Sequence, residues 1–522
     1  MDAPWTALLA WDAAPTLAPP LVAIVLALLT RRVVVSLAAA ALVGALVAAR
    51  GGPLNAIAIL FRTGSEVVLD TDNLTVAAFS LLVAAMVGVM EASGGTRALV
   101  ARIERLAKGR RGTMVASWLS GGVVFFDDYA NCLVVGSAMG PLADRTGVSR
   151  AKLAYIVDAT AAPVASLAII STWVGYEVGL FGDALAGLDP ELVQLHAGAS
   201  GFGLFLQALP YRFYCILTLL FVGMVAITGR DFGPMAVEEA RAAARPRPAP
   251  SASDELKASP WLAALPVLTL IVVTFSALWW DGWRSLGADA VGAPLFDVFG
   301  AADAFGAMLL GSVVSLTVAV VLSVVLRALA PRAVPGAAGS AAKSVLQALV
   351  VLYLAWTLGS LIKQIGAPDF IAAAIDGRVP LAVLPGLVFV LSAATAFSTG
   401  SSFFTMGALI PIVIPVAVLL GGGGIDHVVV IASAAAVLDG AVLGDHASPI
   451  SDTTILSSLG SRVDVVTHVR TQLPYVAVVG ATTIVVCALP AALGVSPWVL
   501  VAVGGLVCFG ALMTLGRVPQ SA

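Results

Sequence analysis

The sequence predicts an all-α polytopic membrane protein with about 11 transmembrane helices and two re-entrant hairpins. Of its 522 residues, 59% are apolar and only 11% are charged, and the mean hydropathy is +1.00. In soluble domains, about a quarter of the residues are charged. Apolar windows of about 20 residues recur along the chain, and a helix of that length crosses about 30 Å of hydrocarbon. The strands of a membrane β-barrel would instead appear as shorter, alternating segments.

The apolar windows, taken in chain order, predict eleven helical spans. They are Leu17–Thr30, Val33–Ala49, Leu74–Glu91, Leu153–Trp173, Gly203–Ile227, Trp261–Trp280, Ala304–Leu326, Ser344–Ile362, Val428–Leu443, Thr471–Leu493 and Pro497–Leu515. Two further apolar stretches, Thr113–Ala143 and Pro380–Leu420, are too long for one span and contain polar residues near their middle. We interpret both as re-entrant hairpins that return to the side they left. Asn55–Leu69 and Gly95–Gly109 are amphipathic and are expected at the membrane interface.

The positions of Lys and Arg set the expected orientation. With the N-terminus outside and both hairpins returning, 22 of the 28 basic residues fall on the inside. This distribution follows the positive-inside rule, whereas a first hairpin that crossed the membrane would move most later loops to the opposite side. We therefore predict a multi-pass protein of the cell membrane, surrounded by lipid. Val174–Ser200, which contains Glu177, is then an external loop, and His468 is expected to be solvated at the end of a span.

The same order of elements occurs twice along the chain: three spans, a hairpin and two spans. The two copies are expected to have opposite orientations in the membrane, as inverted five-helix repeats. The predicted parts are an N-terminal repeat at 1–228 with its hairpin at 113–143, a cytoplasmic linker at 229–259, a C-terminal repeat at 260–493 with its hairpin at 380–420, and an extra C-terminal helix and tail at 494–522. A short helix is expected near Val237–Ala244 in the linker.

Polar residues inside the apolar stretches form the candidate site. A carboxylate in hydrocarbon costs at least ~2.5–3.5 kcal/mol, so ionisable groups there usually line a substrate or ion path. Transporters with inverted repeats place such sites near the midplane, on broken helices. The first hairpin offers Asp127, Asp128 and Asn131; the second offers Ser398, Thr399, Ser401, Ser402 and Thr405; and two helices interrupted at Pro163 and Pro449 offer Asp158, Thr160, Ser166, Asp439, Asp445, His446, Ser448, Ser451, Asp452, Thr453 and Thr454.

These residue types suit a small hard cation and a proton. Sodium takes several oxygen ligands from carboxylate, hydroxyl, amide and backbone groups. Burial raises the pKa of a carboxyl group from its usual value near 4, so a proton competes with the cation for the same group. Asp127 is also suited to capping a half-helix, Asp439 to a hydrogen bond with a facing helix, and His446 to orienting Asp445. For Arg212, snorkelling and neutralising an acid are both open.

Four blocks of the sequence stand out. They are Phe-Phe-Asp-Asp-Tyr-Ala-Asn at 125–131, Lys152–Ala165, Gly444–Ser458 and Thr471–Tyr475. Together they resemble the signature blocks of the NhaC-type sodium/proton antiporter family. The resemblance implies inverted five-span repeats with re-entrant hairpins and a homodimer. It also implies an ion site at or near Asp128, Asn131, Asp158, Asp445, Ser448, Ser451, Asp452 and Thr453, with sodium at Asp128, Asn131, Asp158, Asp445 and Asp452.

One block departs from the family pattern. The second hairpin of the family tends to read Gly-Thr-Ser-Trp-Gly-Thr, whereas this chain has Gly-Ser-Ser-Phe-Phe-Thr at 400–405. Hydroxyl groups are kept at Ser401, Ser402 and Thr405. Phe404 replaces a small residue at a point where the backbone could approach a substrate.

The leading hypothesis is a secondary transporter that exchanges sodium or lithium for protons by alternating access, with cation and proton competing for buried aspartates. The alternative is a sodium- or proton-coupled exchanger of small organic acids or amino acids. The ions are then substrates, and no cofactor is expected. The chain lacks the Gly-x-Gly-Asp signature of intramembrane aspartyl proteases and a His-Glu-x-x-His zinc motif, so no enzymatic activity is expected. A net charge of −3 gives no indication of nucleic-acid binding.

Overall fold

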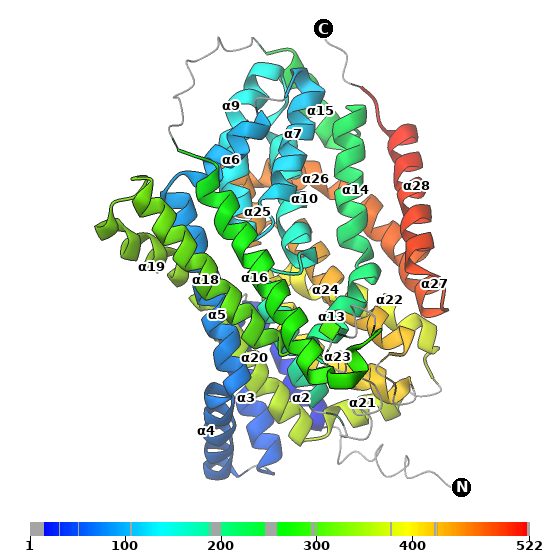
Figure 1. The fold of residues 1–522 in the computed structure, drawn as a ribbon. Coiled ribbons are helices and arrows are strands. Elements are labelled where there is room, and N and C mark those ends of the chain that lie inside the picture. Colours follow the sequence, from blue (N-terminus) through cyan, green and yellow to red (C-terminus); the bar gives the residue numbers. More distant parts are fainter. Residues whose placement is uncertain are drawn as a thin grey trace.

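The computed structural model of the protein describes residues 15–30, 32–50, 52–104, 107–186, 188, 200–245, 258–293, 298–299, 301–375, 378–421, 424 and 426–518. The longer stretches of the predicted parts that lie outside this description are 1–14 of the first repeat, 189–199 of the expected external loop, 246–257 of the linker and 519–522 of the tail; residue 187 of the same loop also lies outside it. Within the described residues the chain is helical and contains no strand, apart from one isolated bridge between Asp231 and Arg517 (Figure 1).

The first half of the chain contains the helices up to the linker. They are α2 (Ala18–Thr30), α3 (Val33–Ala48), α4 (Pro53–Leu69), α5 (Thr71–Ala92), α6 (Gly95–Glu104), α7 (Gly109–Val123), α8 (Asp128–Ala130), the π-helix η2 (Asn131–Val135), α9 (Gly136–Thr146), α10 (Arg150–Leu167), α11 (Val174–Ala186), α13 (Gly201–Ala208), the 3-10 helix η3 (Leu209–Tyr211), α14 (Phe213–Thr228) and α15 (Gly233–Ala243).

The second half contains the helices after the linker. They are α16 (Trp261–Leu286), η4 (Gly287–Ala290), α18 (Ala304–Val325), η5 (Pro331–Ala333), α19 (Val334–Ser344), α20 (Leu346–Gln364), α21 (Ala367–Ile375), η6 (Leu381–Val383), α22 (Leu384–Thr399), α23 (Ser402–Leu420), α24 (Val428–Ala447), α25 (Asp452–Ser461), α26 (Val465–Thr482), the π-helix η7 (Thr483–Ala488), α27 (Leu489–Ala492) and α28 (Pro497–Leu515).

The order of elements in the two halves is the same. The helix α5 and the short α6 correspond to α20 and α21. The hairpin arms α7 and α9 correspond to α22 and α23. The broken helix α10–α11 corresponds to α24–α25, and the bent helix α13–α14 corresponds to α26–α27. The division of the chain into two repeats with re-entrant hairpins stays a prediction, and so does the inverted orientation of the two halves.

Nine helices among the described residues are long and apolar enough to cross a membrane, and up to 11 if each of two bent helix pairs counts as one span. The bent pairs are α3 with α4, at 120°, and α13 followed by η3 with α14, at 45°. The second hairpin differs from the first because each of its arms, Leu381–Thr399 and Ser402–Leu420, has the length of a full span. The arms of the first hairpin, α7 and α9, are shorter.

The predicted break at Pro163 is wrong. α10 continues through Pro163 to Leu167, and the chain leaves helical structure only between Ala168 and Trp173. The free carbonyl groups at the end of α10 are capped there, because Ser171 Oγ donates to Ala165 O at 2.7 Å. A proline removes one backbone donor without ending a helix that neighbouring helices support. The predicted break at Pro449 is confirmed, since α24 ends at Ala447 and α25 begins at Asp452.

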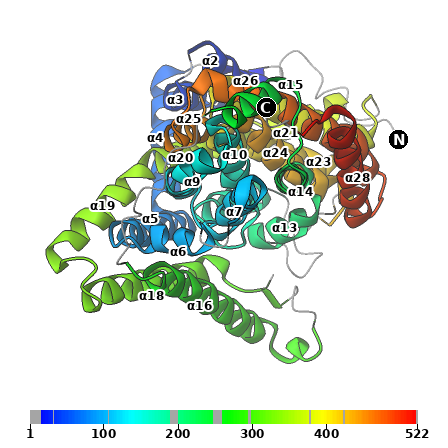
Figure 2. The ribbon, with the colours of Figure 1, turned by 90° about the horizontal axis from the view of Figure 1, so that it is seen from above.

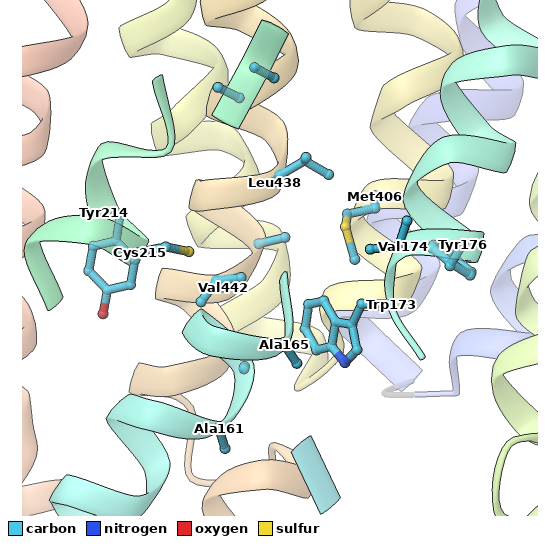
Figure 3. Close-up of a cluster of buried hydrophobic side chains, with 14 of the residues drawn as sticks. Ala161, Ala165, Trp173, Val174, Tyr176, Tyr214, Cys215, Met406, Leu438 and Val442 are labelled. Atoms are coloured by element: carbon cyan, nitrogen blue, oxygen red, sulfur yellow. The ribbon is translucent and has the colours of Figure 1, made fainter. Parts of the chain in front are cut away.

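The apolar core lies where the broken helix α10–α11 crosses α14, α23 and α24. Figure 3 shows Ala161, Ala165 and Trp173 from the first of these elements with Leu438 and Val442 from α24. All five side chains are at most 1% exposed. The core therefore packs directly around the breaks that carry polar groups.

α16 and α18 form an arm at the edge of the bundle, seen along the lower side of Figure 2. They pack on each other and on α5, and only 33% of the apolar window of each is buried inside the protein. Trp279, Trp280 and Trp283 are exposed near the end of α16. Such exposed indole rings are typical of the membrane–water interface.

The linker begins with α15, which confirms the short helix expected near Val237–Ala244. Glu239 of α15 is fully buried, where it pairs with Arg110 and accepts from the backbone N of Ser149 at 2.7 Å. Just before α15, Asp231 pairs with Lys152 and accepts from Tyr475 Oη at 2.8 Å. These buried contacts attach the start of the linker to the ends of α7, α10 and α26.

Candidate cation and substrate site

The tip of the first hairpin is the break between α7 and α8. Asp127 caps α8, since its Oδ1 accepts from the backbone N of Ala130 at 2.8 Å, as predicted. Its Oδ2 accepts from Thr172 Oγ1 at 3.3 Å, and the backbone N of Thr172 donates to Phe126 O at 3.1 Å. The tip is thereby joined to the break between α10 and α11. Asp128 is only 4% exposed, and its Oδ2 makes no hydrogen bond of normal length and angle.

Asn131 holds the first hairpin closed. Its Nδ2 lies 2.8 Å from Gly121 O, 3.2 Å from Val124 O and 3.0 Å from Thr160 O. The amide therefore bridges both arms of the hairpin and α10, a structural role that the sequence analysis did not assign. Only Oδ1 of Asn131, which is buried without a partner, is free to contact an ion. The residue also begins the π-helix η2, a local geometry that is frequent at functional sites.

The tip of the second hairpin is Gly400 and Ser401. Gly400 has φ +67, and a Cβ atom there would lie 2.7 Å from Ile450 O, so glycine allows the tip to pack on the break between α24 and α25. Ser401 Oγ accepts from the backbone N of Phe404 at 3.2 Å. Ser402 Oγ donates to Ala441 O at 3.3 Å, and Thr405 Oγ1 donates to Ser401 O at 3.0 Å.

Phe404 does not lie where its replacement of a small residue suggested. It is fully buried in a second apolar cluster with residues of α2, α3 and α20. Phe403 instead faces the cavity described below, and its carbonyl oxygen accepts a hydrogen bond from Tyr176. The replacement at Phe404 therefore affects how the second hairpin packs against α2, α3 and α20, and it does not change the lining of the cavity.

The break after α24 gathers several of the predicted residues. Asp445 Oδ2 accepts from Thr453 Oγ1 at 3.0 Å, and Thr453 Oγ1 lies 3.1 Å from Ser451 Oγ. Ser448 Oγ donates to Phe397 O at 2.7 Å and so binds the break to the second hairpin. Asp452, in the first turn of α25, is exposed and accepts from Tyr129 Oη at 3.2 Å.

Asp158 is the most extensively hydrogen-bonded acid of the predicted set. It is 1% exposed, and its Oδ2 accepts from Thr454 Oγ1 at 3.2 Å, His468 Nε2 at 3.1 Å and Gln472 Nε2 at 3.1 Å. Its Oδ1 is buried without a partner. His468 is fully buried, so the expectation that it is solvated is wrong. His468 and Gln472 are one helical turn apart on α26, and Gln472 lies within a block that the sequence analysis quoted without assigning it a role.

Arg212 neutralises buried acids, which decides between the two expectations for this residue. Its Nε donates to Asp439 Oδ1 at 2.9 Å, and its Nη1 lies 3.7 Å from Glu177 Oε2. Nη1 also donates to Ser166 O at 3.1 Å, at the end of α10. The expected external loop at Val174–Ser200 is therefore wrong over α11, where Glu177 is fully buried. Asp439 makes the contact with a facing helix that was predicted, since it also accepts from the backbone N of Tyr214 at 2.6 Å.

His446 contacts Tyr214 and not Asp445. Its Nδ1 lies 2.9 Å from Tyr214 Oη, and its carbonyl oxygen accepts from Gln472 Nε2 at 2.6 Å. Nε2 of His446 is buried without a partner. The predicted orienting role toward Asp445 is wrong because consecutive side chains of α24 point in different directions.

Replacing Arg212 with leucine is expected to destabilise the protein by about 3–5 kcal/mol, because it leaves the carboxylates of Asp439 and Glu177 buried without a counter-charge. A lowered midpoint of thermal unfolding in detergent would measure the effect. The double change Arg212→Leu with Asp439→Leu should recover only part of the loss, since an apolar pair often replaces a buried ion pair without cost but Glu177 stays without its counter-charge. Equal stability of the single variant and the parent protein would contradict the assigned network.

A cavity of about 390 Å³, which we call the central cavity, lies between the hairpin tips, the broken helices and the helices α3, α5 and α20. Its lining includes Asp127, Asp128 and Tyr129 of the first hairpin, Thr399, Gly400, Ser401 and Phe403 of the second, Thr172 and Tyr176 at the first broken helix, and Ile450 and Asp452 at the second. Arg32, Ser80, Gln347 and a set of Val and Leu side chains complete it. Five of the predicted residues thus meet around one space: Asp127, Asp128, Thr399, Ser401 and Asp452.

The other predicted residues lie deeper. Asp445 lies within electrostatic range of Asp128, Asp158 and Asp452, so the carboxylates form a series from the central cavity to Asp158. No group of three or more His, Cys, Asp or Glu side chains in the described part of the chain has the geometry of a metal site. Of the five residues expected to hold sodium, Asp128 and Asp452 line the central cavity, Asp158 and Asp445 lie deeper, and Asn131 is held inside the first hairpin.

Comparison with known proteins decides the family. The sequence profile of the Na+/H+ antiporter family matches residues 164–489, which is more than half of the chain and includes both breaks after α10 and α24. The chain belongs to the Na+/H+ antiporter family. It is a multi-pass membrane protein, and its family and fold are those of transporters and not of enzymes.

Individual proteins are also similar to this antiporter-family chain, one over most of its length and two over shorter segments. An uncharacterized protein of Haemophilus influenzae is 32% identical over 473 residues, covering 90% of this chain and 89% of the relative. The arginine/ornithine antiporter ArcD of Halobacterium salinarum is 33% identical over 140 residues, 27% of each chain. The malate-2H(+)/Na(+)-lactate antiporter of Bacillus subtilis is 33% identical over 108 residues, 19% of this chain and 22% of the relative.

The fold has a known counterpart. The crystal structure of the YdaH transporter of Alcanivorax borkumensis superposes with a TM-score of 0.60, at 20% identity, over 85% of this chain and 90% of the other. At that identity the likeness concerns the fold alone. It confirms the prediction of an all-α polytopic fold.

Proposed function

We propose that the protein exchanges sodium or lithium for protons by alternating access, with cation and proton competing for the buried aspartates of the central cavity and of the Asp158 cluster. The family and the relatives identify an antiporter-type secondary transporter. The choice of sodium or lithium and protons as the coupled ions, and of alternating access as the mechanism, is our proposal. The observation that carries it is a pair of cavities separated by a closed seam.

A second cavity of about 340 Å³, the distal cavity, shares three helices with the central cavity. On α11, Tyr176 lines the central cavity and Asp183 the distal one. The same holds for Leu352 and Gly359 on α20, and for Phe403 and Pro411 on α23. A separation of seven or eight residues corresponds to roughly 11 Å along a helix. The two cavities therefore lie about two helical turns apart along one seam between α11, α20 and α23.

The seam is closed by close packing. Trp356 of α20 is fully buried, and a Cβ atom on Gly179 of α11 would lie 3.0 Å from its ring. A Cβ atom on Gly407 of α23 would lie 2.6 Å from Ala355 Cβ and 2.9 Å from Tyr176 Oη. A cavity on each side of a thin closed seam is the arrangement expected for a transporter that opens its site to one side at a time. Movement of the hairpins relative to α20 would open the seam.

The acids supply the coupling. Asp127, Asp128 and Asp452 line one cavity, and their mutual repulsion favours a bound cation or a bound proton. A cation that binds displaces protons from the same groups, so transport of one is exchanged for transport of the other. Hydroxyl and carbonyl oxygens of Thr399, Ser401 and the hairpin tips are suitable additional ligands.

The proposed orientation puts the N-terminus outside and the linker in the cytoplasm, in the cell membrane. Arg110, Arg111, Arg145, Arg241 and Arg245 belong to the ends of α7, α9 and α15, which lie together at the top of Figure 1. This clustering supports the side assigned to them, because basic residues favour the cytoplasmic face. The division into inverted repeats and the homodimer stay predictions of the sequence and of the family resemblance.

A sodium- or proton-coupled exchanger of small organic acids or amino acids is the second candidate. The volume of the central cavity favours it, because about 390 Å³ lies in the range of sites for small organic ligands, roughly 300–1,000 Å³. The names of two relatives include organic solutes: arginine and ornithine in one, and malate and lactate in the other. Because the first pair of solutes is cationic and the second is anionic, these names do not indicate what charge a solute of this chain would carry.

Everted membrane vesicles test the leading proposal. Addition of sodium or lithium should collapse an imposed pH gradient in vesicles that contain the protein, and Asp128→Asn should remove the response. Asp72→Asn is the matched control, because Asp72 is an exposed acid in the first turn of α5 and does not line the central cavity. If neither ion changes the gradient at any pH tested, cation/proton exchange is the wrong function.

A further inference from the structure

We propose that the central cavity binds an organic solute that carries a protonated amine, with the ammonium group at Asp128 and Asp452. This inference rests on the second candidate above, an exchanger of organic solutes, and specifies its substrate class. A carboxylate anion is the alternative that the geometry disfavours.

The size of the central cavity argues against a bare ion as its only occupant. Its volume is about 390 Å³, whereas one water molecule takes a share of about 30 Å³ in the liquid. A single cation would leave most of the space to water. A solute of several carbon atoms fits the volume.

The charge of the lining argues against an anion. Three carboxylates, those of Asp127, Asp128 and Asp452, face the cavity. Among its described lining residues, Arg32 is the one basic side chain, and it is exposed at the start of α3. An anion would meet an excess of like charge, whereas a cation would be attracted.

Asp128 is the observation that points to a ligand. It is 4% exposed, it lines the cavity, and its Oδ2 makes no hydrogen bond of normal length and angle, although the indole of Trp173 lies close to the carboxylate. A buried carboxylate oxygen without a donor is costly unless a ligand supplies one. Asp127 differs, because the backbone N of Ala130 and the hydroxyl of Thr172 already donate to its two oxygens.

Aromatic and apolar walls complete the site. Tyr129, Tyr176 and Phe403 line the cavity, and the rings of Tyr176 and Phe403 pack edge to face with centroids 4.7 Å apart. Ring faces attract ammonium groups. On α3 and α20 the lining is mostly apolar, with Val33, Val35, Leu349 and Leu352, and Gln347 is the polar exception on α20. The acids come from the hairpin and the second broken helix and the apolar groups from the two other helices, which suits an ammonium head on a carbon chain.

Binding to the purified full-length protein tests the inference. The probes are 1,4-diaminobutane, L-ornithine and glutarate, titrated calorimetrically in potassium phosphate buffer without sodium or amines. We expect one or both amines to bind and glutarate not to bind. Asp128→Asn should weaken amine binding at least about thirtyfold, because it removes one partner of a buried charge pair. Asp452→Asn should weaken it as well, and Asp72→Asn should not change it.

The outcomes separate this inference from the proposed function. If both amines bind, the ammonium group is sufficient for binding. If only ornithine binds, its carboxylate is also required, and Arg32 in the cavity lining could pair with that carboxylate. Preferential binding of glutarate overturns the inference. Binding of neither amine also overturns the inference. If sodium still collapses the pH gradient in vesicles in that case, the proposed cation/proton exchange stands although the amine site does not. Monodisperse elution of each variant shows that it is folded, and Asp452→Asn, at an exposed residue, keeps the test valid if Asp128→Asn does not fold.

Discussion

Replacing Asp158 with asparagine is expected to abolish sodium-dependent proton exchange while leaving the protein folded. The side chain keeps its size, and Thr454, His468 and Gln472 can still donate to the amide oxygen. The change removes the charge that a cation or a proton would neutralise. Removing one partner of a buried charge pair costs about 3–5 kcal/mol, so cation affinity should fall at least about 100-fold. Sodium binding and pH-gradient collapse in everted vesicles are the measurements.

Two comparisons make this result specific to Asp158. Asp72→Asn removes an exposed acid from α5 and should leave exchange unchanged. His468→Gln keeps a donor near Asp158 and should reduce cation affinity less than Asp158→Asn, by about 10–100-fold, as for residues that orient a ligand. Undiminished exchange by folded Asp158→Asn would exclude the cluster around Asp158 from the ion path.

A disulfide across the seam is expected to stop transport reversibly. In the double variant Ala355→Cys with Gly407→Cys, the two Cβ atoms begin about 1 Å closer than the usual disulfide separation of about 3.5–4.5 Å, so a small outward shift allows the bond. The bond would hold α20 against α23 and keep the two cavities separated. Oxidation should therefore abolish exchange, and a thiol reductant should restore it. Vesicle exchange before and after reduction measures the effect.

The single cysteine variants are the controls, and both should transport regardless of oxidation. The native cysteines, Cys132, Cys215, Cys487 and Cys508, are all buried, so they do not compete for the bond. Cross-linking is verified by mass spectrometry of the intact protein. Undiminished exchange by a fully cross-linked protein would mean that the seam does not open during transport.

Hydropathy predicted the ends of three apolar helices closely. Val33–Ala49, Ala304–Leu326 and Pro497–Leu515 were predicted to within one residue at each end, because an apolar window and its polar flanks coincide with the helix. The hairpins were predicted from the same property, since a polar interruption in an overlong apolar stretch indicates a break. The break in α10 was misplaced because proline is a weak signal inside a membrane helix, where neighbouring helices supply the missing support.

The candidate site was predicted in part. Asp127, Asp128 and Asp452 were identifiable because an acid in an apolar stretch is unusual wherever it lies. The partners of the acids were not, since a histidine, a glutamine or a glutamate near a polar segment is ordinary in any sequence. Glu177 was assigned to a loop because the apolar run that precedes it ends at the break, although α11 continues into the protein.

By itself, the sequence determined the class of protein and the acids that stand in its apolar stretches. Those features depend on properties that are read locally along the chain, namely the length of an apolar window and the cost of a charge inside it. Only the tertiary structure decided which groups meet. Asp158 lies beside His468, 310 residues away, and Arg212 beside Asp439, 227 residues away. Such contacts depend on how each helix is rotated and where it crosses its neighbours, and that geometry is set by the packing of the whole bundle.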